Sequence, residues 1–339
     1  MKLVKFFAGA AIALAAALIA TTTSAEPVKI RIAWATAPGH ITPLIPKAPK
    51  EIYRHYGKSY VVEPVFIAGS GPSLQAIAAG EIELGGLSPQ SLVLGIAEAK
   101  IPLKAIAQLL SSDIPGHGAN GFWVRTDAGI DKVTDLKGKK LGVNARGSSI
   151  DAAVRTMLNR HGLKDGDDYQ IVEVRFPAQF AALESKRIDM AILLQPFNYV
   201  AEKKGGFKQL FTMGDALGPA ETLSYVGKAE WIDKNRAAIV DFLEDHMRMR
   251  RWLVDPKTRM EAVKVLAEVT KRPVEQYADW AFTSKDTGYR APDLLIDPAR
   301  FQKNVDDLKK VGVLPMSIPV AAHIDLSLAK AAAARVTTN

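Results

Sequence analysis

The chain has 339 residues, 48% hydrophobic and 24% charged, which is enough for a sizeable core in one large or two medium domains. It contains no cysteine, which excludes a disulfide framework, thiolate metal sites, a cysteine nucleophile and a lipid-modified N-terminal cysteine. The formal net charge of +8 is spread along the chain, which argues against nucleic-acid binding and weakly favours anionic ligands.

The N-terminus has the pattern of a secretory signal peptide. Lys2 and Lys5 precede an apolar run, Phe6 to Ala20, which is too short for a membrane span. Small residues then lead to a cleavage site after Ala25. We expect a mature, soluble, monomeric protein that begins at Glu26, carries a formal charge of +6 after the loss of two lysines, and resides in the periplasm.

The first part of the mature chain alternates strands with helices. An expected strand, Val28–Trp34, ends in a loop that runs to His40. The next strand, Tyr60–Ile67, ends in Gly69-Ser70-Gly71, after which a helix starts at Pro72 or Ser73. Further expected elements are a helix over Lys50–Tyr56, a short strand within Gly80–Pro89, a helix over Gln90–Ala99 and a strand over Leu103–Leu110.

A second unit of the same kind follows a loop-rich crossing over Ser111–Gly121. Its expected elements are strands at Gly121–Arg125, Lys140–Asn144, Gln170–Val174, Ile188–Leu194 and Phe207–Phe211, with helices from Ser149 and over Gln179–Ser185. Thr222–Val226 is expected to cross back, and helices are expected over Ile232–Leu253, Arg259–Thr270, Val274–Ala281 and Pro298–Val311. This order predicts an α/β protein with mainly parallel sheets. The expected division is a signal peptide (1–25), a first lobe (26–117 and 219–325), a second lobe (118–218) and a flexible tail (326–339).

Two strand–turn–helix units carry a glycine–serine turn, at Gly69-Ser70-Gly71 and at Gly147-Ser148-Ser149. Each helix start leaves backbone N–H groups unpaired beside a hydroxyl, which suits the oxygen atoms of a small anion. An ordinary capped helix is the alternative for either turn. Because ligands of open α/β sheets bind at the carboxyl ends of strands, the turns predict a cleft between two lobes.

Other side chains near strand ends are candidates for the same cleft. His40 and His117 are possible donors, Trp34 and Phe197 possible apolar walls, and Arg175 a possible fork to an oxyanion. The alternatives are a surface position for His40, core packing for Trp34, and a rim salt bridge of Arg175 to Glu173 or Glu184. Arg146 is expected to be solvent-exposed. The six histidines are scattered, so no metal site is expected.

Three segments resemble periplasmic substrate-binding proteins of the sulfonate, taurine and nitrate ABC-importer family. They are FIAGSGPSLQAIAAGEIELG at 66–85, DLKGKKLGV at 135–143 followed by the Gly147-Ser148-Ser149 turn, and AALESKRIDMA at 181–191. The resemblance implies a two-lobed periplasmic-binding-protein fold of type II, with two crossings between the lobes. It also implies no cofactor, no catalysis, and transient delivery of the ligand to an ABC permease and its ATPase.

The resemblance places ligand loops on segments that include most of the candidates already named. The combined expected site comprises Trp34, Thr36, Pro38, His40, Gly69, Ser70, Gly71, Ser88, His117, Ser148, Ser149, Arg175, Gln195 and Phe197. The expected ligand is a small organic anion, an aliphatic sulfonate such as taurine or an aromatic carboxylate. An exported sensor or an enzyme on the same fold is the rival class, although the sequence has no Gly-x-Ser-x-Gly elbow and no Gly-Lys-Ser phosphate loop.

Overall fold

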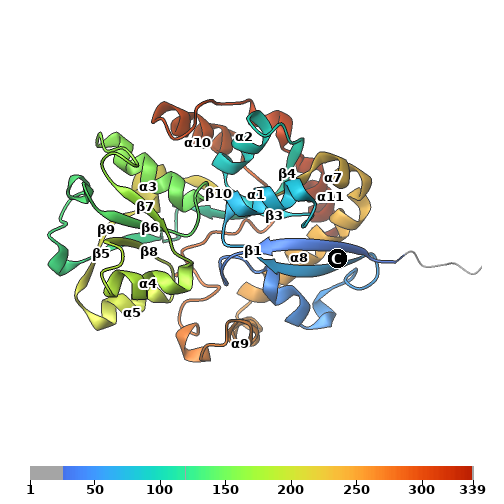
Figure 1. Ribbon diagram of the computed structural model, residues 1–339. Helices are drawn as coiled ribbons and strands as arrows, with labels where there is room; N and C mark the ends of the chain where they lie inside the picture. The colour runs from blue at the N-terminus through green and yellow to red at the C-terminus, as the bar shows by residue number, and fades with distance from the viewer. Residues whose placement is uncertain (1–25, 119, 338–339) are drawn as a thin grey trace, which may run out of the picture.

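The computed structural model describes residues 26–118 and 120–337, which form two lobes side by side (Figure 1). The expected signal peptide, residues 1–25 with cleavage after Ala25, lies outside the described residues. No helix in the described ranges is long and apolar enough to cross a membrane.

The first lobe contains strands in the spatial order β2-β1-β3-β10-β4. The parallel pair β1–β2 and the antiparallel set β3-β10-β4 are joined through a parallel bridge between Ile32 and Leu84. The strands are β1 (Val28–Trp34), β2 (Tyr60–Phe66), β3 (Gly85–Leu87), β4 (Leu103–Ser112) and β10 (Ala220–Lys228).

The second lobe repeats this arrangement in a five-stranded sheet of order β7-β6-β8-β5-β9. Its strands are β5 (Gly121–Arg125), β6 (Lys140–Val143), β7 (Gln170–Glu173), β8 (Met190–Leu193) and β9 (Phe207–Thr212). The prediction of mainly parallel sheets is confirmed, with β5 and β10 running against their neighbours. Each of these two strands enters its sheet directly from the other lobe, so no helical crossover sets its direction.

Helices cover both faces of each sheet (Figure 1). Those of the first lobe are α1 (Ser70–Ala79), α2 (Pro89–Ala97), α7 (Ala229–Lys234), α8 (Arg236–Val254), α9 (Arg259–Thr270), α10 (Pro298–Lys310) and α11 (Leu326–Thr337). Those of the second lobe are α3 (Ser149–Arg160), α4 (Phe176–Glu184), α5 (Phe197–Lys204) and α6 (Met213–Leu217). Short 3-10 turns occur at Thr42–Lys47, Lys50–Ile52, Thr126–Ala128, Val133–Leu136, Val274–Gln276 and Val320–His323.

Several expected helices differ from those observed. The helix expected over Ile232–Leu253 is broken at Asn235 into α7 and α8. The helices expected at Lys50–Tyr56 and Val274–Ala281 are reduced to one 3-10 turn each, in both cases directly after a proline. In both cases the proline itself is the N-cap residue and is extended, with ψ 133° at Pro49 and ψ 143° at Pro273.

The expected flexible tail is wrong as well. Its described residues Leu326–Thr337 form α11, which packs along α8. Leu328, Ala329, Ala332 and Val336 are buried in the same cluster as the first-lobe core. Their spacing places them on one face of a helix, and small alanines let that face approach α8 closely.

Candidate ligand-binding site

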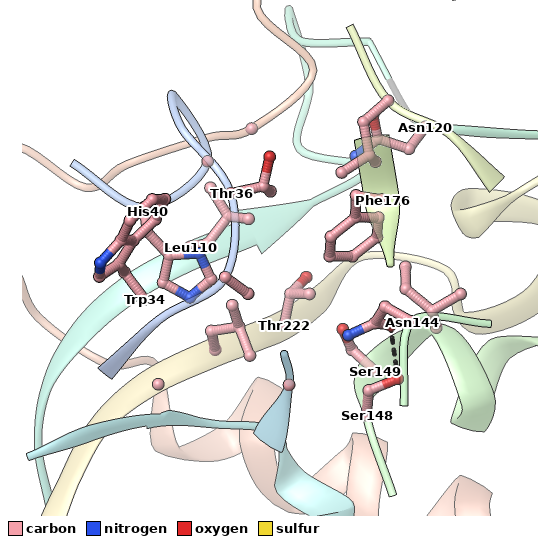
Figure 2. Close-up of a pocket in the computed structure, with 18 of the residues that line it drawn as sticks. Trp34, Thr36, His40, Leu110, Asn120, Asn144, Ser148, Ser149, Phe176 and Thr222 are labelled. Carbon is pink, nitrogen blue, oxygen red and sulfur yellow. Dashed lines mark hydrogen bonds between the residues drawn. The ribbon is translucent and has the colours of Figure 1, made fainter. Parts of the chain in front are cut away.

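A cavity of about 90 Å³ lies between the lobes, at the carboxyl ends of β1, β2, β6 and β8 (Figure 2). One water molecule needs about 10–15 Å³ of such space, so the cavity holds roughly six to nine groups of water size. The loop after β1 and the start of α1 line it from the first lobe. The end of β6, the start of α3 and the start of α4 line it from the second.

Many of the residues expected from sequence line this cavity. They are Trp34, Thr36, Pro38, His40, Gly69, Ser70, Ser148, Ser149 and Gln195. The cavity is also lined by residues that were not expected from the sequence. These are Asn120, Asn144, Phe176, Thr222, Trp280 and the loop Asp286–Gly288. Asn144 and Phe176 follow β6 and β7 in the sequence, so the strand-end rule could have found them.

Aromatic side chains form much of the apolar wall. Trp34 and Phe176 face the cavity from opposite lobes (Figure 2), and Trp280 also lines it. The ring of Trp34 meets that of Phe66 edge to face, with centroids 5.2 Å apart. These rings provide a flat, apolar surface for the body of an organic ligand.

The hydroxyls of the two expected anion-binding serines are already used within their own lobes. Ser70 Oγ donates to the Gly86 carbonyl (3.0 Å) and accepts from the Ser88 N–H (3.1 Å). Ser148 Oγ caps α3 by accepting from the Asp151 N–H (3.2 Å), and it donates to Asn144 Oδ1 (2.9 Å; Figure 2). Ser149, at the first position of α3, makes no side-chain hydrogen bond to another described residue. Its hydroxyl and the backbone N–H groups of Ser149 and Ile150 are therefore the donors left at this end of the cavity.

Gln195 reaches the cavity, but its amide is also occupied. Its Nε2 donates to Tyr199 Oη and to the Lys285 carbonyl, both at 2.8 Å, and its Oε1 accepts from the Thr287 N–H at 3.1 Å. These bonds join the second lobe to the segment after α9. Gln195 thus fixes the shape of the cavity wall.

His40 is buried in the wall, and its imidazole is neutral at neutral pH. Burial lowers the pKa of His40 to about 4, and the positive charge of Arg290 acts in the same direction. Asp286, the one carboxylate among the described lining residues, is paired with Arg290 at 3.0 Å. No lysine or arginine belongs to the lining formed by the described residues.

The electrostatic field of the cavity comes instead from helix ends. The helices α1, α3 and α4 all begin at residues that line it: Ser70, Ser149 and Phe176. The N-terminus of a helix carries a partial positive charge of roughly half an elementary charge, with N–H groups that point outward. Such an arrangement can hold a small anionic group through neutral donors.

The remaining expected residues lie outside the lining. Ser88 caps α2, and a Cβ atom on Gly71 would lie within 4 Å of the backbone of the Arg146–Gly147 turn. Arg175 stacks on Phe66, and Phe197 lies under the Arg272 guanidinium. His117 packs edge to face on Tyr289, with ring centroids 5.1 Å apart. The side chains of Ser88, Arg175, Phe197 and His117 are thus engaged by a helix end, a cation or another ring.

Two further expectations concern arginines and metals. Arg146 is half exposed and pairs with Asp165 at 2.7 Å, while Arg175 makes neither of the salt bridges considered for it. Glu184 pairs with Lys204 instead, and Glu173 accepts from the Arg146 N–H. Among the described residues, no group of three His, Asp or Glu side chains could hold a metal ion.

Comparison with known proteins places this site in a family. Residues 61–252 match the family described as NMT1/THI5 like. No curated protein matches the chain by sequence.

Several solved structures share the fold of the chain. The alkanesulfonate-binding protein SsuA from Xanthomonas axonopodis pv. citri, bound to MOPS, is 18% identical over 89% of this chain and 99% of its own, with a TM-score of 0.68. The periplasmic nitrate-binding protein NrtA from Synechocystis PCC 6803 is 17% identical over 93% and 90%, with a TM-score of 0.70. The desulfurization enzyme DszB is 14% identical over 91% and 99%, with a TM-score of 0.58.

The resemblance drawn from the sequence is confirmed for family and fold. The matched segment runs from β2 into the last turn of α8, and so includes the whole second lobe and both glycine–serine turns, but not the loop after β1. The chain belongs to the NMT1/THI5-like family, and its two lobes have the periplasmic-binding-protein fold.

Proposed function

We propose that this chain is the periplasmic solute-binding component of an ABC importer, which captures a small organic anion between its lobes. The observation that carries the proposal is the convergence of α1, α3 and α4 on one interlobe cavity. Solute binding by SsuA and NrtA, which share the fold, supports the same role. The expected signal peptide would deliver the chain to the periplasm as a monomer, where it would dock transiently on a permease with its ATPase.

The proposed ligand has an anionic head and an apolar body. The head lies at the start of α3, where the N–H groups of Ser149 and Ile150 and the Ser149 hydroxyl can donate to sulfonate or carboxylate oxygens. The body lies against Trp34, Phe176 and Trp280. An aliphatic sulfonate fits the head site, and the three aromatic rings favour an aromatic carboxylate as the second candidate.

Binding without conversion is supported by the chemistry of the lining. A hydrolytic enzyme needs a nucleophile activated by an adjacent base. Within the described part of the chain, the serines Ser70 and Ser148 bond to carbonyl, amide and backbone groups, not to a histidine or carboxylate. The likeness to DszB keeps an enzymatic role as the competing proposal.

A thermal-shift screen with matched pairs of compounds tests the proposal. The panel contains alkanesulfonates, taurine, nitrate, aromatic carboxylates and pyrimidines, with an alkanesulfonamide and an aromatic amide as uncharged counterparts. We expect an anion to raise the melting temperature and its uncharged counterpart to leave it unchanged. An equal response to both members of a pair would contradict the anion site, and a product detected by mass spectrometry after incubation would contradict the binding role.

A further inference from the structure

Several residues expected in the ligand site lie instead on direct contacts between the two lobes. Ser88, Arg175 and Phe197 touch the opposite lobe and are absent from the cavity lining. Ser91, which was not an expected site residue, also touches the opposite lobe. These contacts occur in two groups, one of hydrogen bonds and one of stacked cations.

The hydrogen bonds join the start of α2 to the turn before α3. Ser88 Oγ and Ser91 Oγ both donate to the Gly147 carbonyl, at 3.0 Å and 2.7 Å. Both serines are buried, and Asn144 Nδ2 adds a third bond to the Ala68 carbonyl at 2.8 Å. The first lobe thus supplies two hydroxyls to one carbonyl oxygen of the second.

The approach of the two backbones at this point depends on glycine. A Cβ atom on Gly147 would lie 3.6 Å from the Gly71 Cα, and one on Gly71 would lie 2.5 Å from the Arg146 carbonyl oxygen. Gly147 also has φ +75°, which L-residues with side chains rarely adopt. Gly71 is therefore required by the close approach of the Arg146 carbonyl, and Gly147 by its positive φ.

The second group consists of two cation–π pairs. In one pair the arginine belongs to the second lobe and the ring to the first, and in the other pair this is reversed. Arg175 of the second lobe lies 5.4 Å from the ring centroid of Phe66 in the first. Arg272, after α9 of the first lobe, lies 4.7 Å from the ring centroid of Phe197 in the second. Because the two members of each pair belong to different lobes, each contact can form only while the lobes are together.

We infer that contacts outside the cavity hold the lobes closed, and that Ser88, Ser91, Arg175 and Phe197 set the closed population without touching the solute. A contact present only in the closed form favours that form whether or not a ligand is bound. A neutral hydrogen bond changes an equilibrium by roughly two- to twelve-fold, and an exposed cation–π pair by roughly two- to five-fold. The inference is independent of which solute the cavity takes.

Distance measurement between spin labels tests this directly. The chain has no cysteine, so Lys330→Cys on α11 and Asp167→Cys in the loop between α3 and β7 supply two unique exposed attachment points on opposite lobes. The distance distribution is recorded without added solute, for this labelled parent and for each variant placed in it.

Ser91→Ala is the cleanest variant because, among the described residues, the Ser91 hydroxyl bonds only to Gly147, whereas Ser88 also caps α2. Arg175→Ala and Phe197→Ala each remove one cation–π pair. The matched controls are Ser185→Ala, whose hydroxyl bonds within its own lobe, and Arg187→Ala, an exposed arginine of the same lobe.

We expect the ratio of short to long distances to fall roughly two- to twelve-fold in Ser91→Ala and roughly two- to five-fold in Arg175→Ala and in Phe197→Ala. The controls should match the parent, and melting curves should show that every variant is folded. If the three variants give the same distance distribution as the parent and the controls, the inference is overturned. A parent found only at long distances would overturn it too.

Discussion

The start of α1 and the start of α3 lie on opposite walls of one cavity, and each is next to a serine. At α1, the Ser70 hydroxyl ties the helix to the end of β3, and Gly71 presses against the other lobe. At α3, Ser148 caps the helix and Ser149 remains with its hydroxyl at the cavity. We propose that the two serine hydroxyls differ in task, with Ser70 serving packing at the start of α1 and Ser149 serving the ligand at the start of α3.

This comparison shows how a hydroxyl beside a helix start should be interpreted. Two serines with the same local sequence environment can have all their hydrogen-bonding capacity used by their own lobe. The next serine, Ser149, makes no side-chain hydrogen bond within the described part of the chain. The role of such a hydroxyl depends on the groups that other parts of the fold place beside it. The local sequence spacing does not reveal those groups.

The largest expected effect concerns His40, on the same wall as α1. Its folded pKa of about 4 lies below the unfolded value of 6.5, so at acidic pH the unfolded chain takes up a proton that the folded chain does not. Stability should be complete above about pH 6.5 and fall by about 3 kcal/mol as the pH drops to about 4. Burial also lowers the pKa of His246 well below its usual value, which adds to the loss.

Urea unfolding of the parent and of His40→Gln across this pH range measures the effect. The variant should lose less stability on acidification than the parent. Identical pH dependence in both proteins would show that His40 is not a buried neutral group of this wall.

Gly71→Ala should separate closure from folding. The added Cβ meets the Arg146 carbonyl oxygen at 2.5 Å, and overpacking of this kind costs roughly 1–3 kcal/mol. We expect solute binding to weaken by five-fold to a hundred-fold. Because alanine is the better helix former, the melting temperature of the protein without solute should stay the same or rise. Unchanged affinity in calorimetry would mean that α1 does not press on the second lobe in the bound form.

Ser70→Ala should reduce stability and leave affinity nearly unchanged. The substitution strands the buried Gly86 carbonyl and Ser88 N–H, at a cost of about 1–3 kcal/mol. Chemical denaturation gives the stability and calorimetry the affinity. A ten-fold loss of affinity with normal stability would return Ser70 to the ligand site.

Ser148→Ala should have the smallest effect, about 1 kcal/mol of stability from the lost helix cap. Ser148→Asp restores a capping oxygen and should recover most of this stability. Failure of that variant to recover it would show that the bond to Asn144, and not the cap, is the main contribution of Ser148.

Much of the fold could be predicted from the sequence because strands and their turns are local signals. The bounds of β1, β2 and β6 agree with the expected ones to within a residue or two. The break between α7 and α8 could not be predicted, since Asn235 lies within a continuous helical pattern. The ordered helix α11 could not be predicted either, because it packs on α8, a segment far from it in the chain.

Site residues could be predicted where they follow a strand in the sequence. Those that lie elsewhere in the chain could not. Trp34 ends β1, His40 lies in the loop after it, and Ser149 follows the turn after β6; all three reach the cavity. Trp280 and the Asp286–Gly288 loop come from an irregular segment after α9, and only the folded first lobe brings them to the cleft. Arg175 and Phe197 also follow strands, but the same strand ends meet the opposite lobe as well as the ligand cavity.

Calorimetry of one anion identified by the screen, on Ser149→Ala and Ser70→Ala in parallel, tests the central claim most directly. A hydrogen bond to a charged group is worth roughly 1.5–3 kcal/mol, so Ser149→Ala should bind the anion about ten-fold to a hundred-fold more weakly. Ser70→Ala should bind it as the parent does. If Ser149→Ala binds the anion with the parent's affinity, the solute does not lie at the start of α3.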